Sequence, residues 1–222
     1  DPDQDTLPPG MYGFYSDPEA NPLDTPSGKL EFWSDALAEH FPDDIERTPM
    51  ARWTVGGPES EGWSHDETLW GERCKDYPLL MVANPGRWRV HVQGDDIKWF
   101  REFETMKVEG PDGYKYEPIW INPMDAEKRG IKGGDIVKLY NDRGTLLLGA
   151  RISERVIPGA VVVNKGSRVD PIAPHIDRGG AANLISPENQ VSKNCRGFAV
   201  SGYLVEAAKM EQAEMDQLKK DY

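Results

Sequence analysis

Apolar residues along the chain fall into short runs separated by turn residues, a pattern typical of a β-rich domain. Residues 78–83 and 160–164 are continuous apolar runs suited to buried strands, whereas residues 28–33 alternate apolar and charged positions. Further strands are predicted at residues 117–121, 136–140, 145–152 and 198–201. Glycine and proline recur between these segments. The pattern therefore predicts a mainly β fold, a small mixed barrel with peripheral helices.

Helical periodicity is confined to a few segments. Ser34 can cap a helix over residues 35–40. A second helix, over residues 124–129, begins at Asn122 or Asp125. Longer helices are predicted at residues 97–106 and 204–218.

Proline and aromatic residues divide the chain into four predicted parts. Residues 1–27 are rich in proline and predict an extended N-terminal arm. Residues 28–76 hold an entry strand, the short helix and a long irregular excursion from residue 42. The excursion carries Trp53, Trp63 and Trp70. Residues 77–205 form the predicted barrel, and residues 206–222 form a C-terminal helix.

The charge of the chain limits its partners. It has 26 basic and 38 acidic residues, a net charge of −12, so nucleic acid and anionic membrane surfaces are not expected to bind it. No apolar run reaches the roughly 18 residues of a membrane span, and no membrane insertion is expected. Cys74 and Cys195 lack the spacing of a disulfide framework or a metal site. A first residue other than Met indicates a mature fragment or one part of a longer polypeptide.

No self-contained catalytic set is visible in the sequence. The four histidines, His40, His65, His91 and His175, form no HExxH or other paired-His motif. GxSxG, P-loop and strand-linked GxGxxG motifs are also missing from the sequence. The sequence therefore gives little support to a stand-alone hydrolase.

Two loops offer binding chemistry instead. Residues 179–183 are a glycine-rich turn ending in Asn183, whose amide suits the mixed donors and acceptors of a pterin or purine edge. Residues 87–93 follow a buried strand and present arginine, histidine and glutamine. Lys165 and Arg168 could neutralise a pyrophosphate. Taken singly, each feature could equally be an ordinary solvated turn.

The same segments, taken in order, carry a resemblance to a known family. They are Thr25-Pro26-Ser27-Gly28-Lys29-Leu30-Glu31, Tyr77-Pro78-Leu79-Leu80, Arg89-Val90-His91-Val92-Gln93, Asn122-Pro123-Met124-Asp125-Ala126, Gly130-Ile131, Gly134-Asp135-Ile136-Val137, Asn141 with Gly144, Pro158-Gly159 and Asn183-Leu184. This ordered set resembles the molybdopterin-dinucleotide-binding domain of the dimethyl sulfoxide reductase family, over roughly residues 25–205.

The resemblance implies the carboxy-terminal cofactor-binding domain of a larger oxidoreductase, folded as a six-stranded double-psi β-barrel of the aspartate-decarboxylase-like kind. It also implies that this domain supplies no catalytic residue and no metal ligand. It implies two molybdopterin guanine dinucleotides with molybdenum or tungsten in the intact parent, and none bound to the fragment alone. The partners it implies are the N-terminal domains of the same catalytic polypeptide and an iron–sulfur electron-transfer subunit. The aromatic excursion is compatible with the branch that resembles pyrogallol–phloroglucinol transhydroxylase.

The resemblance also assigns site residues. His91 and Gln93 are implied as pterin or phosphate contacts, with Arg89 in the same loop, and Asn183 as a pterin contact. Asn122 and Asp125 are implied as nucleotide contacts. Lys165 and Arg196 are added on charge alone, and the basic residues are expected to gather on one face.

The sequence leaves two alternative functions open. One is a decarboxylase-like barrel enzyme that cleaves its own chain before a serine, for which the Gly166–Ser167 peptide bond is the candidate. The other is a barrel-type protein-interaction module that uses residues 42–76 as its partner surface.

Overall fold

The computed structural model describes residues 11–51, 69, 71–187, 190–192, 195–198 and 202–221. The chain divides into two compact units, Asp1–Thr54 and Val55–Tyr222. The three tryptophans of the predicted excursion, Trp53, Trp63 and Trp70, lie outside the described residues.

The described residues of the N-terminal unit include two short helices, α1 (Tyr12–Ser16) and α2 (Asp35–His40). The Ser34 hydroxyl accepts a hydrogen bond from the Leu37 backbone N–H at 3.3 Å, as the predicted cap requires. The prediction of an arm without regular structure is wrong at α1. The predicted strand over residues 28–33 does not form, because Phe32 and its neighbours meet no partner strand among the described residues and remain exposed.

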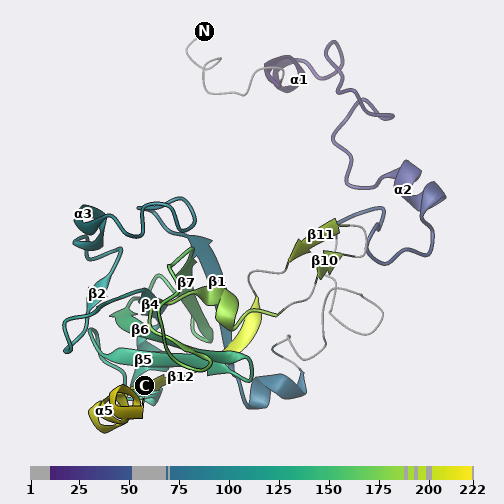
Figure 1. The fold of residues 1–222 in the computed structure, drawn as a ribbon. Coiled ribbons are helices and arrows are strands. Elements are labelled where there is room, and N and C mark those ends of the chain that lie inside the picture. The colour runs from purple at the N-terminus through teal and green to yellow at the C-terminus, as the bar shows by residue number, and fades with distance from the viewer. Residues whose placement is uncertain are drawn as a thin grey trace. The chain divides into compact units, whose positions relative to one another are not determined.

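Six strands of the second unit close into a barrel (Figure 1). They are β1 (Leu79–Pro85), β4 (Pro118–Ile121), β5 (Ile136–Asn141), β6 (Gly144–Ile152), β7 (Ala160–Lys165) and β12 (Tyr203–Lys209). Their order around the barrel is β4-β7-β1-β12-β5-β6, and β6 pairs with β4 to complete the circle. The predicted mainly β class and the six-stranded barrel are confirmed.

The barrel connectivity repeats itself about a two-fold relation. Exchanging β1, β4 and β5 with β6, β7 and β12 leaves every strand pairing unchanged. The parallel pair β1–β7 then maps onto the parallel pair β4–β6, while the other pairings are antiparallel. Two interlocked halves, each contributing to a parallel pair, make the double-psi arrangement.

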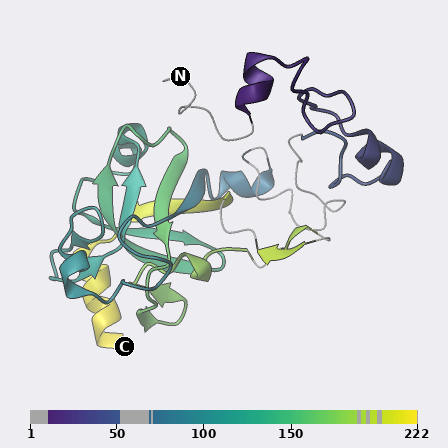
Figure 2. The same ribbon diagram turned by 90° about the horizontal axis from the view of Figure 1, so that it is seen from above.

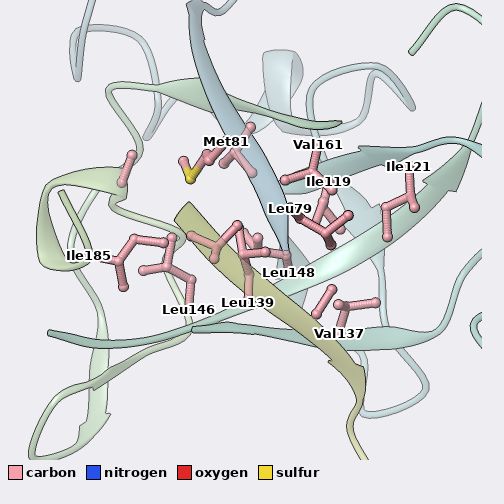
Figure 3. Packing of buried hydrophobic residues seen from close by; sticks show 14 of the residues in the cluster. Leu79, Met81, Ile119, Ile121, Val137, Leu139, Leu146, Leu148, Val161 and Ile185 are labelled. Carbon is pink, nitrogen blue, oxygen red and sulfur yellow. The ribbon is translucent and has the colours of Figure 1, made fainter. Parts of the chain in front are cut away.

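The barrel interior is filled with aliphatic side chains (Figure 3). β1 alternates buried and half-buried positions, so Leu79 and Met81 point inwards while their neighbours face the other way. Side chains from the other barrel strands meet them, including Ile119, Val137, Leu139, Leu146, Leu148 and Val161. Burial of this kind supplies roughly 1.5–3 kcal/mol per large apolar side chain, which makes the barrel the stable part of the unit.

A smaller cluster lies on the outside of the barrel. The C-terminal helix α5 (Gln212–Asp221) buries Met215 against Leu147 of β6, and Tyr116 and Ile136 belong to the same cluster. Figures 1 and 2 both show this helix outside the strands. The predicted helix over residues 204–218 is therefore wrong at its start. Its first part is β12, which fills the gap between β1 and β5 and so gains pairing on both edges.

The remaining elements lie outside the six barrel strands. They are the strands β2 (Val108–Glu109), β3 (Lys115–Tyr116), β8 (Pro171–Ala173), β9 (Ile176–Asp177), β10 (Gln190–Ser192) and β11 (Cys195–Phe198), the helices α3 (Lys98–Arg101) and α4 (Pro123–Lys128), and the 3₁₀ turns η3 (Glu72–Lys75) and η4 (Ala182–Leu184). β9 and β8 extend the sheet beyond β6, and β2-β3 and β10-β11 form two separate two-stranded sheets. The helix predicted over residues 97–106 is shorter than expected and is followed by turns. No helix in the described part of the chain has the length and apolar character needed to cross a membrane.

Candidate functional site

Two neighbouring strands of the barrel end at one edge. β1 and β7 run parallel, in a register that pairs Leu80 with Ala160 and Pro85 with Lys165. The segment after β1, residues 86–95, therefore leaves the barrel beside the segment after β7, residues 166–170. Loops held at strand ends by a rigid scaffold are where binding residues concentrate.

Arg89 points from the first of these segments into the protein. Its guanidinium donates to Glu117 in a bidentate pair, with N–O distances of 2.8 and 2.9 Å, and to Asp95 at 3.0 Å. It also donates to the backbone carbonyls of Asn164 and Lys165 at the end of β7. With its side chain only 1% exposed, Arg89 ties the two loops together and does not face solvent.

Glu117, the residue before β4, is the centre of this arrangement. Besides Arg89, its carboxylate accepts from the Lys107 ammonium at 2.9 Å and from the Ser167 hydroxyl at 2.6 Å. Lys107 also pairs with Asp95 at 2.9 Å. We call these five buried residues, Arg89, Asp95, Lys107, Glu117 and Ser167, the Glu117 cluster. Two cations balance two anions in it, as a buried charged group requires.

The charges of the cluster reinforce one another. Burial raises the pKa of Asp95, but Lys107, the Arg168 backbone N–H and Arg89 outweigh it and hold that pKa below its usual range. Burial lowers the pKa of Arg89, yet Glu117 and Asp95 raise it above its usual value. Asp95 and Arg89 therefore both stay charged at neutral pH.

His91 lies on a tight turn directly after Arg89. Val90 and Gln93 exchange backbone hydrogen bonds of 3.1 and 3.0 Å across it, and His91 has a left-handed φ of 52°. Gly166, with a φ of 86°, lies against the His91 backbone, where any side chain would collide with the His91 carbonyl. The turn leaves the side chains of His91 and Gln93 exposed. A left-handed non-glycine residue costs about 1–3 kcal/mol and is typical of functional sites.

A third segment, residues 179–183, is fastened to the same edge. The Asp177 carboxylate, 2% exposed, accepts from the backbone N–H groups of Asp170 at 2.6 Å and Ala181 at 2.8 Å. Gly180 fits against Glu117, whose Cβ would lie 2.5 Å from a Cβ at that position. The glycine-rich turn thus ends in η4 with Asn183 exposed.

The three segments and the end of β7 together present hydrogen-bonding side chains and positive charge. His91, Gln93 and Asn183 are exposed and carry hydrogen-bonding side chains. Arg87 is exposed beside the Trp88 ring, Lys165 is half-buried, and Arg168 is exposed and paired with Asp96. Cations and amide groups are the side chains that pyrophosphate and pterin edges require. The donor set therefore fits a pterin dinucleotide.

Asn122 and Asp125 do not join this set. β4 runs antiparallel to β7, with Ile121 opposite Val161, so residues after β4 lie at the opposite end of the barrel. Asn122 caps α4 by accepting from Met124 and donates to the Val156 carbonyl at 2.7 Å. Buried Asp125 accepts from the Gly159 N–H at 2.6 Å. Both side chains are used to stabilise the fold.

The structure adds residues that the sequence patterns did not single out for binding. Glu117, Asp95, Lys107, Ser167 and Asp177 hold the three loops. Only their buried positions reveal this role, because charged residues are ordinarily solvated. Arg196 lies in β11, and its side chain is outside what the structure describes.

An open hollow of about 390 Å³ adjoins the site and is lined by Asp95, Arg101, Lys107, Tyr114, Arg168 and Asp170 among others. A larger hollow of about 740 Å³ lies between Gly133 and Met215 and includes none of the predicted contact residues. Within the described residues, no group of three or more His, Cys, Asp or Glu side chains could hold a metal ion.

Comparison with known proteins agrees with this description. The model of the family described as "Molydopterin dinucleotide binding domain" matches residues 90–202, which include His91, Gln93 and the second and third segments of the site. Among solved structures, acetylene hydratase from Pelobacter acetylenicus matches with a TM-score of 0.55 and 16% identity, covering 85% of this chain and 24% of that one. That likeness concerns the fold.

Curated relatives are similar in sequence over most of the chain. Dimethyl sulfoxide reductase DmsA from Escherichia coli K12 is 34% identical over 180 residues, 79% of this chain and 20% of the relative. The pyrogallol hydroxytransferase large subunit from Pelobacter acidigallici is 34% identical over 198 residues, 85% of this chain and 22% of the relative. The chain thus spans about a fifth of the length of these relatives.

Proposed function

The chain belongs to the molydopterin dinucleotide binding domain family, and on this premise we propose that it is the cofactor-binding domain of a larger molybdenum or tungsten oxidoreductase of the dimethyl sulfoxide reductase type. The observation that carries the proposal is the edge where β1 and β7 end together. Three loops meet there, and each presents polar side chains that suit pyrophosphate or pterin.

Each proposed contact residue of that edge has its own role. Lys165, Arg87 and Arg168 neutralise the phosphate charge of a dinucleotide, so a chain of net charge −12 can hold a polyanion. His91, Gln93 and Asn183 exchange hydrogen bonds with the pterin edges. Arg168 must exchange its exposed partner Asp96 for the ligand, and an exposed ion pair contributes little stability that this exchange would lose.

The structure changes the proposed role of three other residues. Arg89 positions the loop and is not itself a contact, since its donors are taken by Glu117, Asp95 and carbonyl groups. Asn122 and Asp125 stabilise the opposite end of the barrel. Arg196 keeps its proposed role as a phosphate contact on charge alone.

In the intact protein, two molybdopterin guanine dinucleotides would supply the redox chemistry at their metal, and this chain would supply binding and orientation. We propose that it closes over the cofactors without providing a metal ligand. The remaining domains of the same polypeptide are its proposed partners, with an iron–sulfur electron-transfer subunit. The self-processing enzyme is not favoured, because the hydroxyl of Ser167, the residue after the candidate bond, donates a hydrogen bond to the buried Glu117 carboxylate.

Two substitutions test the contacts. His91→Ala and Asn183→Ala in the full-length protein should each lower bound pterin several-fold while the fold is retained, because each removes an exposed polar contact. Pterin is measured by fluorescence after oxidation, and folding by circular dichroism. His175→Ala is the matched control, since His175 is also exposed and left-handed, with a φ of 61°. Pterin content equal to that of the control in both variants would refute the assignment.

A further inference from the structure

We infer that Glu117 is the positioning residue of the whole cofactor face, an inference that rests on the function proposed above. Its carboxylate is fully buried and does not reach the surface. It contacts or supports each of the three segments that carry the proposed contact residues. It therefore acts through other residues and not on the cofactor itself.

The hydrogen bonds of the carboxylate define its reach. One oxygen accepts from Arg89 at 2.9 Å. The other accepts from Arg89 at 2.8 Å, Lys107 at 2.9 Å and Ser167 at 2.6 Å. Arg89 leads directly to His91 and Gln93, while Ser167 follows Lys165 and Gly166 in the chain. One buried group thus fixes the loops after β1 and after β7.

The third segment depends on the same side chain through packing. Gly180 lies against the Cβ and Cγ of Glu117, and the turn it belongs to ends at Asn183. Two further carboxylates complete the arrangement. Asp95 accepts a hydrogen bond from the Arg168 backbone N–H at 3.1 Å, and Asp177 accepts one from the Asp170 backbone N–H at 2.6 Å. The segment of residues 166–170 is consequently held at Arg168 by Asp95 and at Asp170 by Asp177.

Stability alone does not explain why these charges are buried. Replacing a buried ion pair by apolar residues of similar volume is often neutral or stabilising, because the desolvation cost of the charges disappears. A bidentate arginine–carboxylate pair offers fixed geometry instead. We therefore expect removal of Glu117 together with one partner cation to change the positions of the loops more than the stability of the barrel.

The test is a charge-balanced double variant of the full-length protein. Glu117→Gln alone would leave the cluster with excess positive charge and would destabilise the fold. Glu117→Met with Lys107→Met removes one charge of each sign and leaves the Arg89–Asp95 pair intact. The matched control is Lys138→Met with Glu214→Met, which removes the ion pair between β5 and α5.

Two readouts are needed. Amide hydrogen exchange on cofactor-free protein should rise at residues 90–93, 166–168 and 179–181 in the Glu117/Lys107 variant, while β5 and β6 stay protected. Bound pterin should fall by roughly tenfold or more, a loss similar to that caused by removing a residue that holds a metal-binding side chain in place. The control variant should match the wild type in both measurements.

The outcomes separate the two proposals. Unchanged exchange in the three segments, or exchange that rises while pterin content stays at the wild-type level, would overturn the role of Glu117. A wild-type protein without pterin would instead refute the proposed function, and this inference would fall with it. Loss of protection together with loss of pterin, in a variant whose barrel remains folded, supports it.

Discussion

At the scale of single residues, Asp95 shows how the site depends on charge. Its carboxylate forms ion pairs with Arg89 and Lys107 and accepts a hydrogen bond from the Arg168 backbone N–H. Although burial raises its pKa, these partners hold the pKa below the usual range. The ionised form is thus stabilised in the folded chain relative to the unfolded one, and folding becomes linked to pH.

Acid should therefore weaken the fold partly through Asp95. Because its folded pKa lies below the unfolded value of about 3.9, its stabilising contribution is complete above about pH 5 and is lost as the pH falls further. Urea unfolding of the 222-residue chain at about pH 7 and pH 4 should show a smaller acid-induced loss for Asp95→Asn than for the wild type. The exposed Asp43→Asn should behave like the wild type, and equal losses in all three would contradict the role of Asp95.

Residue patterns predicted the right loop but not the direction of every side chain in it. The R-x-H-x-Q segment identified His91 and Gln93, which are exposed, together with Arg89, which is buried. The partner of Arg89 is Glu117, 28 positions later in the chain. Which charged residue becomes buried depends on such distant partners, and local sequence does not contain that information.

At the scale of elements, the site depends on the close approach of two loops. Gly166 and Gly130 both have positive φ angles, 86° and 63°. A side chain at Gly130 would meet open space, whereas one at Gly166 would collide with the His91 carbonyl. The two glycines thus separate the cost of backbone strain from the cost of displacing a neighbouring loop.

Gly166→Ala should destabilise the chain more than Gly130→Ala. Both variants carry the left-handed penalty of about 1–3 kcal/mol, and the first must also move the turn that presents His91. Urea unfolding of each variant gives the comparison. If the two alanine variants lose the same stability, the loops do not pack as tightly as described.

Elements with a strong local pattern were predicted well, and elements decided by tertiary pairing were not. The hairpin of β5 and β6 and the capped helices α2 and α4 follow from local turn and cap residues. Residues 204–209 have an apolar periodicity compatible with a helix but form β12, because a strand there pairs with both β1 and β5. Phe32 shows the converse, since its alternating segment has no partner strand in the described residues.

At the scale of the whole molecule, an acidic chain presents a face suited to an anion. The net charge is −12, yet Arg87, Lys165 and Arg168 lie on neighbouring loops at one edge of the barrel. The double-psi connectivity explains how, because a parallel pair brings two strand ends and their loops together. The chain spans about a fifth of its curated relatives, so the proposed cofactors would also need groups from the rest of the protein.

The most direct test of the central claim is the metal and pterin content of the full-length protein purified under strict anoxia. Elemental analysis gives molybdenum and tungsten, and fluorescence of the oxidised cofactor gives pterin. We predict about two pterins for each metal atom, as two dinucleotides bound to one metal require. Protein that is folded and complete but contains neither metal nor pterin would contradict the proposal and favour an interaction module instead.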